Sequence, residues 1–409
     1  MKKIMSLILT AALAVGCLVG CGSTPDNNNA NNAGTESAQG DVAGTNNDSE
    51  YKIAMITDYG DITDMSFNQT TYEACKAFAE ANDVEFKYYK PTGDSTAERV
   101  ASVEQAVDEG FNVIVMPGYA FGGTIVEVAE EYSDIKFFAL DVAKGDILEA
   151  AVAKAGEEYD YNPDNWNLED YVKLDNVYCA IYQEELSGYM AGYAAVKLGY
   201  EKLGFLGGMA VPAVVRFGYG FVQGCDAAAA ELGKTVDIKY GYGGQFKGDA
   251  DITATMDTWY KGGTEVVFAC GGGIYTSAAE AAQKVGGKVI GVDTDQKGVI
   301  DSAYGDGITV TSAMKGLAPT VSDTLADILA GKWSDYAGTI KTLGLVSENP
   351  EDNYVQIPME STQWADGFTV DDYKALVAKM YSGEIKVSND ISAMPETTAA
   401  NVEVFDSIK

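Results

Sequence analysis

YKIAMITDYGDITDMSFNQTTYEACKAFAEAN, residues 51–82, contains a complete strand, loop and helix from which the rest of the chain can be interpreted. Its apolar run Ile53–Thr57 is typical of a buried strand, which the polar tripeptide DYG then interrupts. The sequence SFNQ at 66–69 has the spacing of a capping box, which predicts that a helix begins there. Asp58, Phe67 and Asn68 are therefore expected at the carboxyl edge of a sheet, where open α/β folds bind ligands.

The same alternation of strands and helices continues along the chain. Strands are expected at Glu85–Tyr89, Asn112–Met116 and Ile135–Leu140, and Asn176–Tyr182 starts a second series of the same kind. Short joins between alternating strands and helices indicate right-handed βαβ units on parallel sheets. We therefore expect an α/β, type I periplasmic-binding-protein fold, with two similar parallel-sheet lobes joined by a hinge of several crossings.

The amino terminus has the features of an export signal. Lys2 and Lys3 precede an apolar run that is too short to span a bilayer, and LVGC at 18–21 matches a bacterial lipobox. Cys21 is therefore the expected site of lipidation. The segment 22–50 is polar and has no aromatic residue, so it is expected to be a flexible tether. Together these features predict a protein anchored by lipid to the extracytoplasmic face of the cell membrane.

The expected division of the chain follows from these segments. Residues 1–20 form the signal peptide, and 21–50 comprise the lipidated Cys and the tether. The first lobe is expected to contain 51–175 and about 297–335, and the second lobe 176–296 and about 336–409. The acidic, aromatic segment 155–175 interrupts the alternation, and we interpret it as an insertion close to the crossing between the lobes.

Composition excludes several classes of function. The net charge of −33 disfavours a nucleic-acid partner, because such a surface repels a phosphate backbone. The absence of histidine removes Ser-His and Cys-His triads and the HExxH zinc site. Four cysteines beyond Cys21 are widely spaced and have no CxxC pairing, so they are expected to be small buried hydrophobic residues; they are Cys75, Cys179, Cys225 and Cys270. No catalytic, metal or cofactor site is therefore expected.

Motifs spread over residues 51 to about 390 resemble the basic membrane protein family, the PnrA-like purine-nucleoside-binding lipoproteins of ABC importers. The pattern TD-x-G-(x)5-SFNQ resembles the first ligand-binding segment of that family. Further matching segments follow in the same order: FLGGMAVP at 205–212 with RFGYGF at 216–221, CGGG at 270–273, IGVDTDQ at 290–296 and TSAMK at 311–315. The insertion 155–175 and the GGQF segment ending at Phe246 depart from the family pattern.

The resemblance implies a monomeric substrate-binding protein that captures a nucleoside between its lobes and delivers it to an ABC permease, while the partner ATPase hydrolyses ATP. Phe67 and Phe246 match the family's pair of stacking aromatics, and Phe217 is a third candidate. Asp293 and Lys315 match residues that bind the ribose. The complete set of ligand-binding residues expected is Asp58, Phe67, Asn68, Asp141, Phe217, Phe246, Gly271, Gly272, Asp293 and Lys315.

Each of these residues also has a purely structural interpretation. The strand-end aspartates could be turn or cap residues, and Phe67 and Phe217 could belong to the core. Arg216 is expected to be exposed or to form a salt bridge between the lobes, and Glu184 with Glu185 suits the start of a helix, where acidic side chains favour the dipole.

Two other classes of function remain open at this stage. One is a sensing or adhesin lipoprotein with the same fold and no role in transport. The other is a nucleoside hydrolase, for which Asp58, Asp61 and Asp64 could imitate a metal-binding cluster. A Rossmann dehydrogenase is disfavoured, because neither DYG at 58–60 nor GGG at 271–273 continues as G-x-G-x-x-G.

Overall fold

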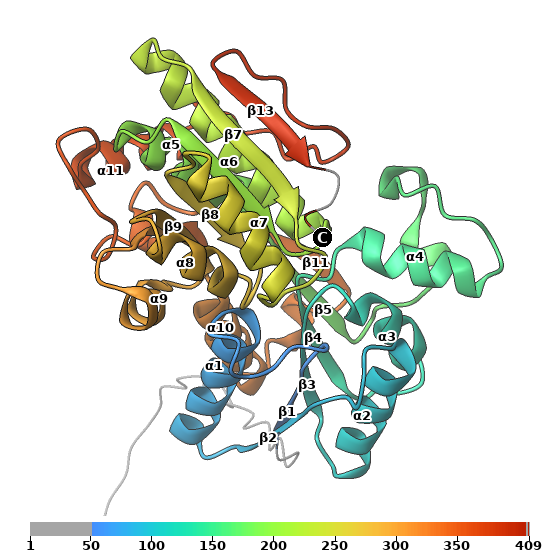
Figure 1. Ribbon diagram of the computed structural model, residues 1–409. Helices are drawn as coiled ribbons and strands as arrows, with labels where there is room; N and C mark the ends of the chain where they lie inside the picture. The colour runs from blue at the N-terminus through green and yellow to red at the C-terminus, as the bar shows by residue number, and fades with distance from the viewer. Residues whose placement is uncertain (1–50, 406–407, 409) are drawn as a thin grey trace, which may run out of the picture. The chain divides into compact units, whose positions relative to one another are not determined.

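Two sheets organise the computed structural model, which describes residues 51–405 and 408 (Figure 1). These residues belong to one unit of the chain, which is described here by itself. The predicted signal peptide, the tether and Cys21 lie outside the described residues. Among those described, no helix has both the length and the apolar character needed to cross a membrane.

The first sheet has the strand order β11-β5-β4-β3-β1-β2, and its neighbouring strands pair in parallel. Its strands are β1 (Lys52–Ile56), β2 (Glu85–Tyr89), β3 (Val113–Pro117), β4 (Lys136–Leu140), β5 (Val177–Tyr182) and β11 (Thr339–Leu343). Alternate residues of a strand point to opposite faces of its sheet. Ala54 and Ile56 therefore pack on one face with α2 (Thr96–Asp108), α3 (Phe121–Val128) and α4 (Lys144–Lys154). Ile53 and Met55 pack on the other face with α1 (Phe67–Asn82) and α10 (Leu317–Leu329).

The second sheet has the order β12-β10-β9-β8-β6-β7-β13, and only its edge strand β12 pairs antiparallel among the described strands. The strands are β6 (Lys202–Gly207), β7 (Val236–Tyr242), β8 (Val266–Cys270), β9 (Lys288–Asp293), β10 (Thr309–Lys315), β12 (Val355–Gln356) and β13 (Ala400–Phe405). Helices α5 (Glu184–Lys197), α6 (Pro212–Leu232) and α11 (Val370–Tyr381) pack on one face. Helices α7 (Ala250–Lys261), α8 (Tyr275–Gln283) and α9 (Lys297–Tyr304) pack on the other.

The chain passes between the sheets three times within the described residues: between β5 and α5, between β10 and α10, and between β11 and β12. The prediction of two parallel-sheet lobes with several crossings is confirmed. The predicted boundaries are wrong at three strands, since β5 and β11 belong to the first sheet and β10 to the second. Strands β5 and β10 are short and mostly buried, and β11 is a short, partly exposed edge strand. Such short segments do not specify which of two similar sheets they will join.

Helices α1 and α2 are capped in different ways. At α2, the Ser95 hydroxyl accepts a hydrogen bond from the backbone N–H of Glu98 and donates one to the Glu98 carboxylate, so this side chain caps the helix. At α1 the helix begins where predicted, but the Ser66 side chain does not cap it. Instead the carboxylate of Asp64 accepts hydrogen bonds from the backbone N–H groups of Ser66, Asn68 and Gln69. The Ser66 hydroxyl is therefore available for a contact with the other lobe.

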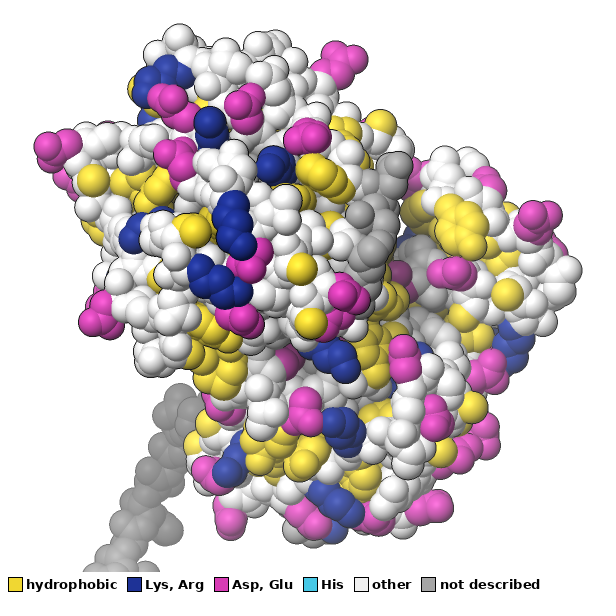
Figure 2. Space-filling model, in the orientation of Figure 1, with side chains coloured by type: hydrophobic (Ala, Val, Ile, Leu, Met, Phe, Trp, Pro, Cys, Tyr) yellow, Lys and Arg dark blue, Asp and Glu magenta, His cyan; other side chains and the backbone are white. Residues whose placement is uncertain are grey.

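The insertion 155–175 contains two short 3₁₀ turns, Pro163–Asn165 and Leu168–Asp170, which pack against α4. It comes one strand before the crossing, because β5 completes the first sheet before the chain leaves it. The acidic composition is visible on the surface of the described residues. In Figure 2, Asp and Glu side chains are spread over the viewed face, with Lys and Arg between them.

Candidate functional site

A cavity of about 750 Å³ lies between the two lobes, bordered by loops that follow strands of both sheets. All ten ligand-binding residues predicted from the sequence border it: Asp58, Phe67, Asn68, Asp141, Phe217, Phe246, Gly271, Gly272, Asp293 and Lys315. They come from segments as far apart in the sequence as the loop after β1 and the end of β10. The geometry brings the predicted set together, and the arrangement of each residue shows what it can do there.

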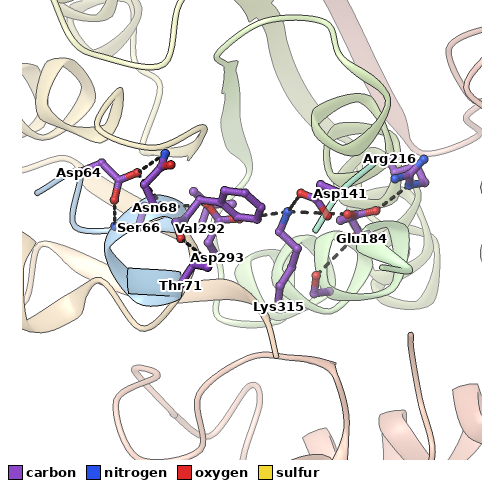
Figure 3. A network of polar contacts seen from close by, with 12 residues as sticks. Asp64, Ser66, Asn68, Thr71, Asp141, Glu184, Arg216, Val292, Asp293 and Lys315 are labelled. Carbon is purple, nitrogen blue, oxygen red and sulfur yellow. Dashed lines mark hydrogen bonds and ion pairs between the residues drawn. The ribbon is translucent and has the colours of Figure 1, made fainter. Parts of the chain in front are cut away.

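Lys315, the last residue of β10, is the centre of a buried ionic cluster (Figure 3). Its ammonium pairs with Asp141 of the first lobe and lies 3.5 Å from Asp293 Oδ1 and 3.7 Å from Glu184 Oε1. Only 3% of the Lys315 side chain is exposed. Burial lowers the pKa of Lys315, but the three carboxylates outweigh this effect and raise the pKa overall. Lys315 is therefore a charged donor in a site with little water.

Asp141 and Asp293 have equivalent positions in the two lobes. Each directly follows or ends a buried parallel strand, and each adopts a left-handed backbone conformation, with φ of 59° and 65°. Such a conformation costs a non-glycine residue of order 1–3 kcal/mol, which aspartate tolerates better than most. The turn directs both carboxylates toward Lys315. Asp293 also accepts a hydrogen bond of 2.6 Å from Ser66 Oγ, which joins the lobes directly.

Asp58 has a mainly structural role. Its Oδ1 accepts hydrogen bonds of 2.6 Å from the backbone N–H groups of Tyr59 and Gly60, which fixes the loop after β1. Burial raises the pKa of Asp58 to about 6, although these backbone hydrogen bonds oppose the shift. The interpretation of Asp58 as a turn residue thus agrees with its contacts, and the carboxylate still borders the cavity.

Among the carboxylate and amide side chains that line the cavity, two buried oxygens have no protein partner within the described residues. They are Asn68 Oδ1 and Asp141 Oδ1, and both are buried. The other polar atoms of these groups are occupied, since Asn68 Nδ2 donates to Asp64 and Asp141 Oδ2 accepts from Lys315. A buried acceptor without a partner is costly, so these two oxygens favour a ligand that carries hydrogen-bond donors.

The aromatic residues differ in how much of each ring belongs to the core. Phe217 is only 1% exposed and packs edge-on against Phe268, at a centroid separation of 6.0 Å. Phe67 is half-buried, packs against core residues, and has the Lys315 ammonium 4.7 Å from its ring centre. Phe246 is half-buried and lies on the loop between β7 and α7.

Sequence reasoning missed three residues of this site. Glu184 is completely buried, and its Oε2 accepts a hydrogen bond of 2.6 Å from Arg216 Nε. Glu184 is thus more than a favourable helix start. The expectation that Arg216 is exposed or forms a salt bridge between the lobes is wrong, because Arg216 is only 14% exposed and its salt bridge joins α6 to α5 within the second lobe. Tyr59 also borders the cavity. Its position in the polar loop directly after a strand-end aspartate was a signal that the sequence contained.

The charged side chains around the cavity are mostly acidic. Seven carboxylates border it, from Asp58, Asp61, Asp64, Asp94, Asp141, Asp146 and Asp293, against four cations, from Lys90, Arg216, Lys247 and Lys315. This balance disfavours an anionic ligand. Within the described residues, no group of three or more acidic or cysteine side chains is arranged to hold a metal ion.

Solved solute-binding proteins share this arrangement of two α/β lobes. A solute-binding protein of an ABC transporter system from Aeropyrum pernix K1 has the same fold, with a TM-score of 0.61 and 20% identity over 83% of this chain and 88% of that chain. A second, from Conexibacter woesei DSM 14684, has a TM-score of 0.59 and 22% identity over 83% of this chain and 99% of that chain. The predicted fold class is confirmed.

The chain belongs to the family of PnrA-like ABC transporter substrate-binding proteins, whose family model matches residues 51–390. It is 25% identical over 366 residues to the ABC transporter nucleoside-binding protein BmpA of Lactococcus lactis subsp. cremoris (strain MG1363), covering 84% of this chain and 89% of that protein. The predicted family is confirmed. The protein is therefore a substrate-binding component that works with the permease and ATPase of an ABC transporter.

Proposed function

We propose that this substrate-binding protein captures a purine nucleoside between its two lobes and delivers it to the permease. The observation that carries the proposal is the arrangement of a charged Lys315, acceptor carboxylates and unpartnered oxygens beside aromatic rings in one cavity. The relative from Lactococcus lactis is named a nucleoside-binding protein, which supports the same class of ligand.

Both parts of a nucleoside, the base and the ribose, match the chemistry of the cavity. Its base is a flat aromatic surface, and base–aromatic stacking is worth about 1–3 kcal/mol per base. Its ribose hydroxyls both donate and accept, so they can receive a hydrogen bond from Lys315 and donate to Asp293. Asn68 Oδ1 and Asp141 Oδ1 provide two further acceptors. A site built from buried polar groups rejects an analogue that leaves them unpaired.

Contacts between the lobes suit a cavity that encloses its ligand. Besides the contacts of Lys315 and Ser66, Gln296 Nε2 of the second lobe donates to the backbone oxygen of Met65 at 3.1 Å. Of the residues that make these contacts, Lys315, Asp141 and Asp293 also line the cavity. A nucleoside that touches both lobes shifts an open–closed equilibrium by its differential affinity for the closed state.

The anchor is part of the proposal. Cys21 follows the lipobox-like LVG, and an uncharacterized lipoprotein of Pyrococcus abyssi (strain GE5 / Orsay) is 24% identical over 300 residues, covering 72% of this chain and 67% of that protein. We expect Cys21→Ser to abolish incorporation of labelled palmitate. Labelling that persists in this variant contradicts the anchor. Membership of an ABC transporter family favours transport over the sensing or adhesin function.

A thermal-shift screen of residues 22–409 tests the class of ligand. Purine and pyrimidine nucleosides, free bases, sugars and amino acids are each added to the same protein. A ligand present at 100 times its dissociation constant stabilises the folded state by about 2.7 kcal/mol, so a nucleoside should raise the melting temperature clearly. Isothermal titration then measures its affinity. A shift with a sugar or an amino acid, and none with any nucleoside, overturns the proposal.

A further inference from the structure

Lys315 is paired with acidic groups of both lobes. Asp141 follows β4 and therefore belongs to the first lobe. Lys315 at the end of β10, Asp293 at the end of β9 and Glu184 at the start of α5 all belong to the second lobe. One carboxylate that contacts the ammonium thus lies across the lobe boundary, and two lie on its own side (Figure 3).

Glu184 and Lys315 also lie at the hinge. Glu184 directly follows the crossing from β5 to α5, and Lys315 directly precedes the crossing from β10 to α10. Backbone hydrogen bonds join these crossings to the third one, from β11 to β12. They run from Gln183 N to Leu343 O at 2.9 Å and from Gly316 N to Tyr354 O at 2.7 Å. Groups close to a hinge keep their separation when two lobes part. Asp141 therefore moves away from Lys315 on opening, whereas Glu184 stays beside it.

The Glu184 carboxylate has one oxygen in use and one without a hydrogen-bond partner. Its Oε2 accepts a hydrogen bond of 2.6 Å from Arg216 Nε, which fixes the orientation of the group. Its Oε1 is buried, has no hydrogen-bond partner among the described residues, and lies 3.7 Å from the Lys315 ammonium. In this structure the ammonium instead donates to Asp141. An unpaired buried carboxylate oxygen is costly, so a slightly closer Lys315 would satisfy it.

The lobe contact brings a third carboxylate into this cluster. Burial raises the pKa of both Glu184 and Asp293, and the charge of Asp141 adds to both shifts. Like charges held close together repel one another, which is why each carboxylate becomes harder to ionise. When Asp141 pairs with Lys315, it is therefore also repelled by the two carboxylates of the second lobe. Glu184 thus weakens the lobe contact, and it offers Lys315 another partner once that contact breaks.

We propose that Lys315 exchanges Asp141 for Glu184 Oε1 when the lobes separate, so that Glu184 is a positioning residue that stabilises the open form. The exchange rests on the lobe closure of the proposed function, and it does not depend on which ligand is bound. Without Glu184, a Lys315 that leaves Asp141 would be a poorly paired buried charge. Glu184 therefore makes opening easier, and with it the release of the ligand to the permease.

Fluorescence energy transfer between the lobes tests the exchange in the absence of any ligand. Dyes are attached to Ala97→Cys on α2 and Ala254→Cys on α7, two exposed positions in different lobes, in the protein comprising residues 22–409. The four native cysteines of the described residues are buried, so they do not compete for the dyes. Transfer efficiencies at pH 8 give the ratio of closed to open protein.

Glu184→Gln is expected to raise this ratio about tenfold, because it removes the charge that holds Lys315 in the open form. The amide oxygen can still accept from Arg216, so the contact between α5 and α6 is kept. Glu185→Gln is the matched control, since this next residue is also buried and forms no ion pair with Lys315 within the described residues. The control should alter the ratio by less than about twofold, and Glu184→Asp, which retains the charge, by less than about threefold.

The affinity for adenosine gives a second readout with a distinctive sign. Since the apparent affinity rises with the fraction of closed protein, Glu184→Gln should bind adenosine up to about tenfold more tightly. A residue that only held Lys315 in place for the ligand would show weaker binding in this variant. A closed-to-open ratio in Glu184→Gln that is equal to or lower than that of wild type overturns the inference. A wild type that binds no nucleoside overturns the proposed function, and the ligand-free ratio still decides the exchange.

A crystal structure of the open, ligand-free wild type needs no variant, so it decides the question even if Glu184→Gln does not fold. Lys315 Nζ should then lie within about 3.2 Å of Glu184 Oε1, which is a hydrogen-bond distance. A separation of more than about 4 Å, the limit of an ion pair, would show that Lys315 does not exchange partners.

Discussion

Asp141 and Asp293 show how much function a single backbone angle controls. Both residues occupy the left-handed region, where most side chains are disfavoured, and both carboxylates consequently approach Lys315. Burial is the largest influence on Asp293 and raises its pKa, while Lys315 and Ser66 oppose the shift. The two aspartates, one at a strand end of each lobe, can thus hold Lys315 between the lobes. Each aspartate keeps part of its hydrogen-bonding capacity for a ligand.

Asp293→Ala is expected to weaken nucleosides about 10- to 100-fold and free bases much less. The variant removes an acceptor for ribose hydroxyls, and a hydrogen bond to a charged group contributes about 1.5–3 kcal/mol. Titration of guanosine and guanine against wild type and the variant measures both effects. Asp306→Ala changes an exposed carboxylate of the same lobe and is the control. Equal losses for guanosine and guanine would show that Asp293 does not act through the ribose.

Glu185 is a buried carboxylate that the proposed binding function does not use. Its Oε2 has no hydrogen-bond partner among the described residues, and burial raises its pKa to about 7. An unfolded glutamate releases its proton near pH 4.3, so between about pH 4.5 and 7 the folded state binds more protons than the unfolded state. Stability therefore falls as the pH rises through this range. Histidine, the usual titrating group in this range, is absent from the chain.

Glu185→Gln should reduce this loss of stability. We expect the free energy of unfolding of wild type to decrease from pH 5 to pH 8, and Glu185→Gln to recover up to about 3 kcal/mol of that decrease. Asp58 and Asp146, whose pKa values burial raises to about 6 and about 7, contribute in the same direction and remain in both proteins. Urea denaturation at several pH values measures the difference. Parallel pH profiles for the two proteins would mean that Glu185 titrates normally.

At the scale of elements, the packing of α5 against α6 places part of the ionic cluster. Glycines on each helix let the other approach: a Cβ at Gly188 would lie 2.2 Å from the backbone oxygen of Phe217, and one at Gly224 would lie 2.1 Å from that of Tyr189. This close contact carries Glu184, at the start of α5, to Arg216 on α6. These glycines are therefore needed because they allow α5 and α6 to pack closely, and not because they form turns.

Gly224→Ala is expected to destabilise the protein by about 1–3 kcal/mol or more, because its Cβ meets backbone that cannot move aside. Intrinsic helix propensity alone predicts the opposite sign, a gain of up to about 1 kcal/mol. Gly298→Ala in α9 provides the matched control, since a Cβ there meets nothing within 4 Å and should stabilise slightly. Thermal unfolding of both variants compares the two effects. A stabilising Gly224→Ala would disprove the close packing of α5 and α6.

At the scale of the whole molecule, the negative net charge favours neutral ligands over anionic ones, because it acts on a charged ligand before that ligand reaches the cavity. The chain has a net charge of −33, and the cavity is bordered by seven carboxylates and four cations. The field of such a protein concentrates cations and depletes anions near its surface. A neutral nucleoside meets no electrostatic barrier, whereas a phosphorylated nucleoside does.

A nucleoside 5′-monophosphate should therefore bind at least about tenfold more weakly than its nucleoside, because 1.4 kcal/mol of repulsion is sufficient for that factor. Added salt screens exposed charges, so the difference should narrow between 10 mM and 500 mM sodium chloride while nucleoside affinity changes little. Titration of adenosine and its 5′-monophosphate at both concentrations measures the ratio. Tighter binding of the monophosphate would indicate that Arg216 and Lys315 form an anion site.

Local patterns in the chain were sufficient to predict most of the elements, and together with the family resemblance they predicted ten residues that line the cavity. The apolar run at Ile53–Thr57, the helix start at Ser66 and the strand-end aspartates depend on neighbours a few residues away, so their structural consequences are visible in the sequence. Parallel strands all end at one edge of a sheet, which is why residues such as Asp58, Asp141 and Asp293 could be expected at one site before any contact was known.

Contacts between segments far apart in the sequence determined the features of the fold and the site that local patterns did not predict. Strands β5, β10 and β11 could each pair in either sheet, and the choice depends on packing across the whole fold. The Ser66 hydroxyl bonds to Asp293, 227 residues away, rather than to its own helix, because Asp64 already satisfies that helix start. Likewise, the ring whose centre lies 6.3 Å from that of Phe246 belongs to Tyr59, whereas Phe67 lies against Lys315 and core residues. Local sequence limits which groups each residue can offer, and the folded chain determines which partner is close enough to accept them.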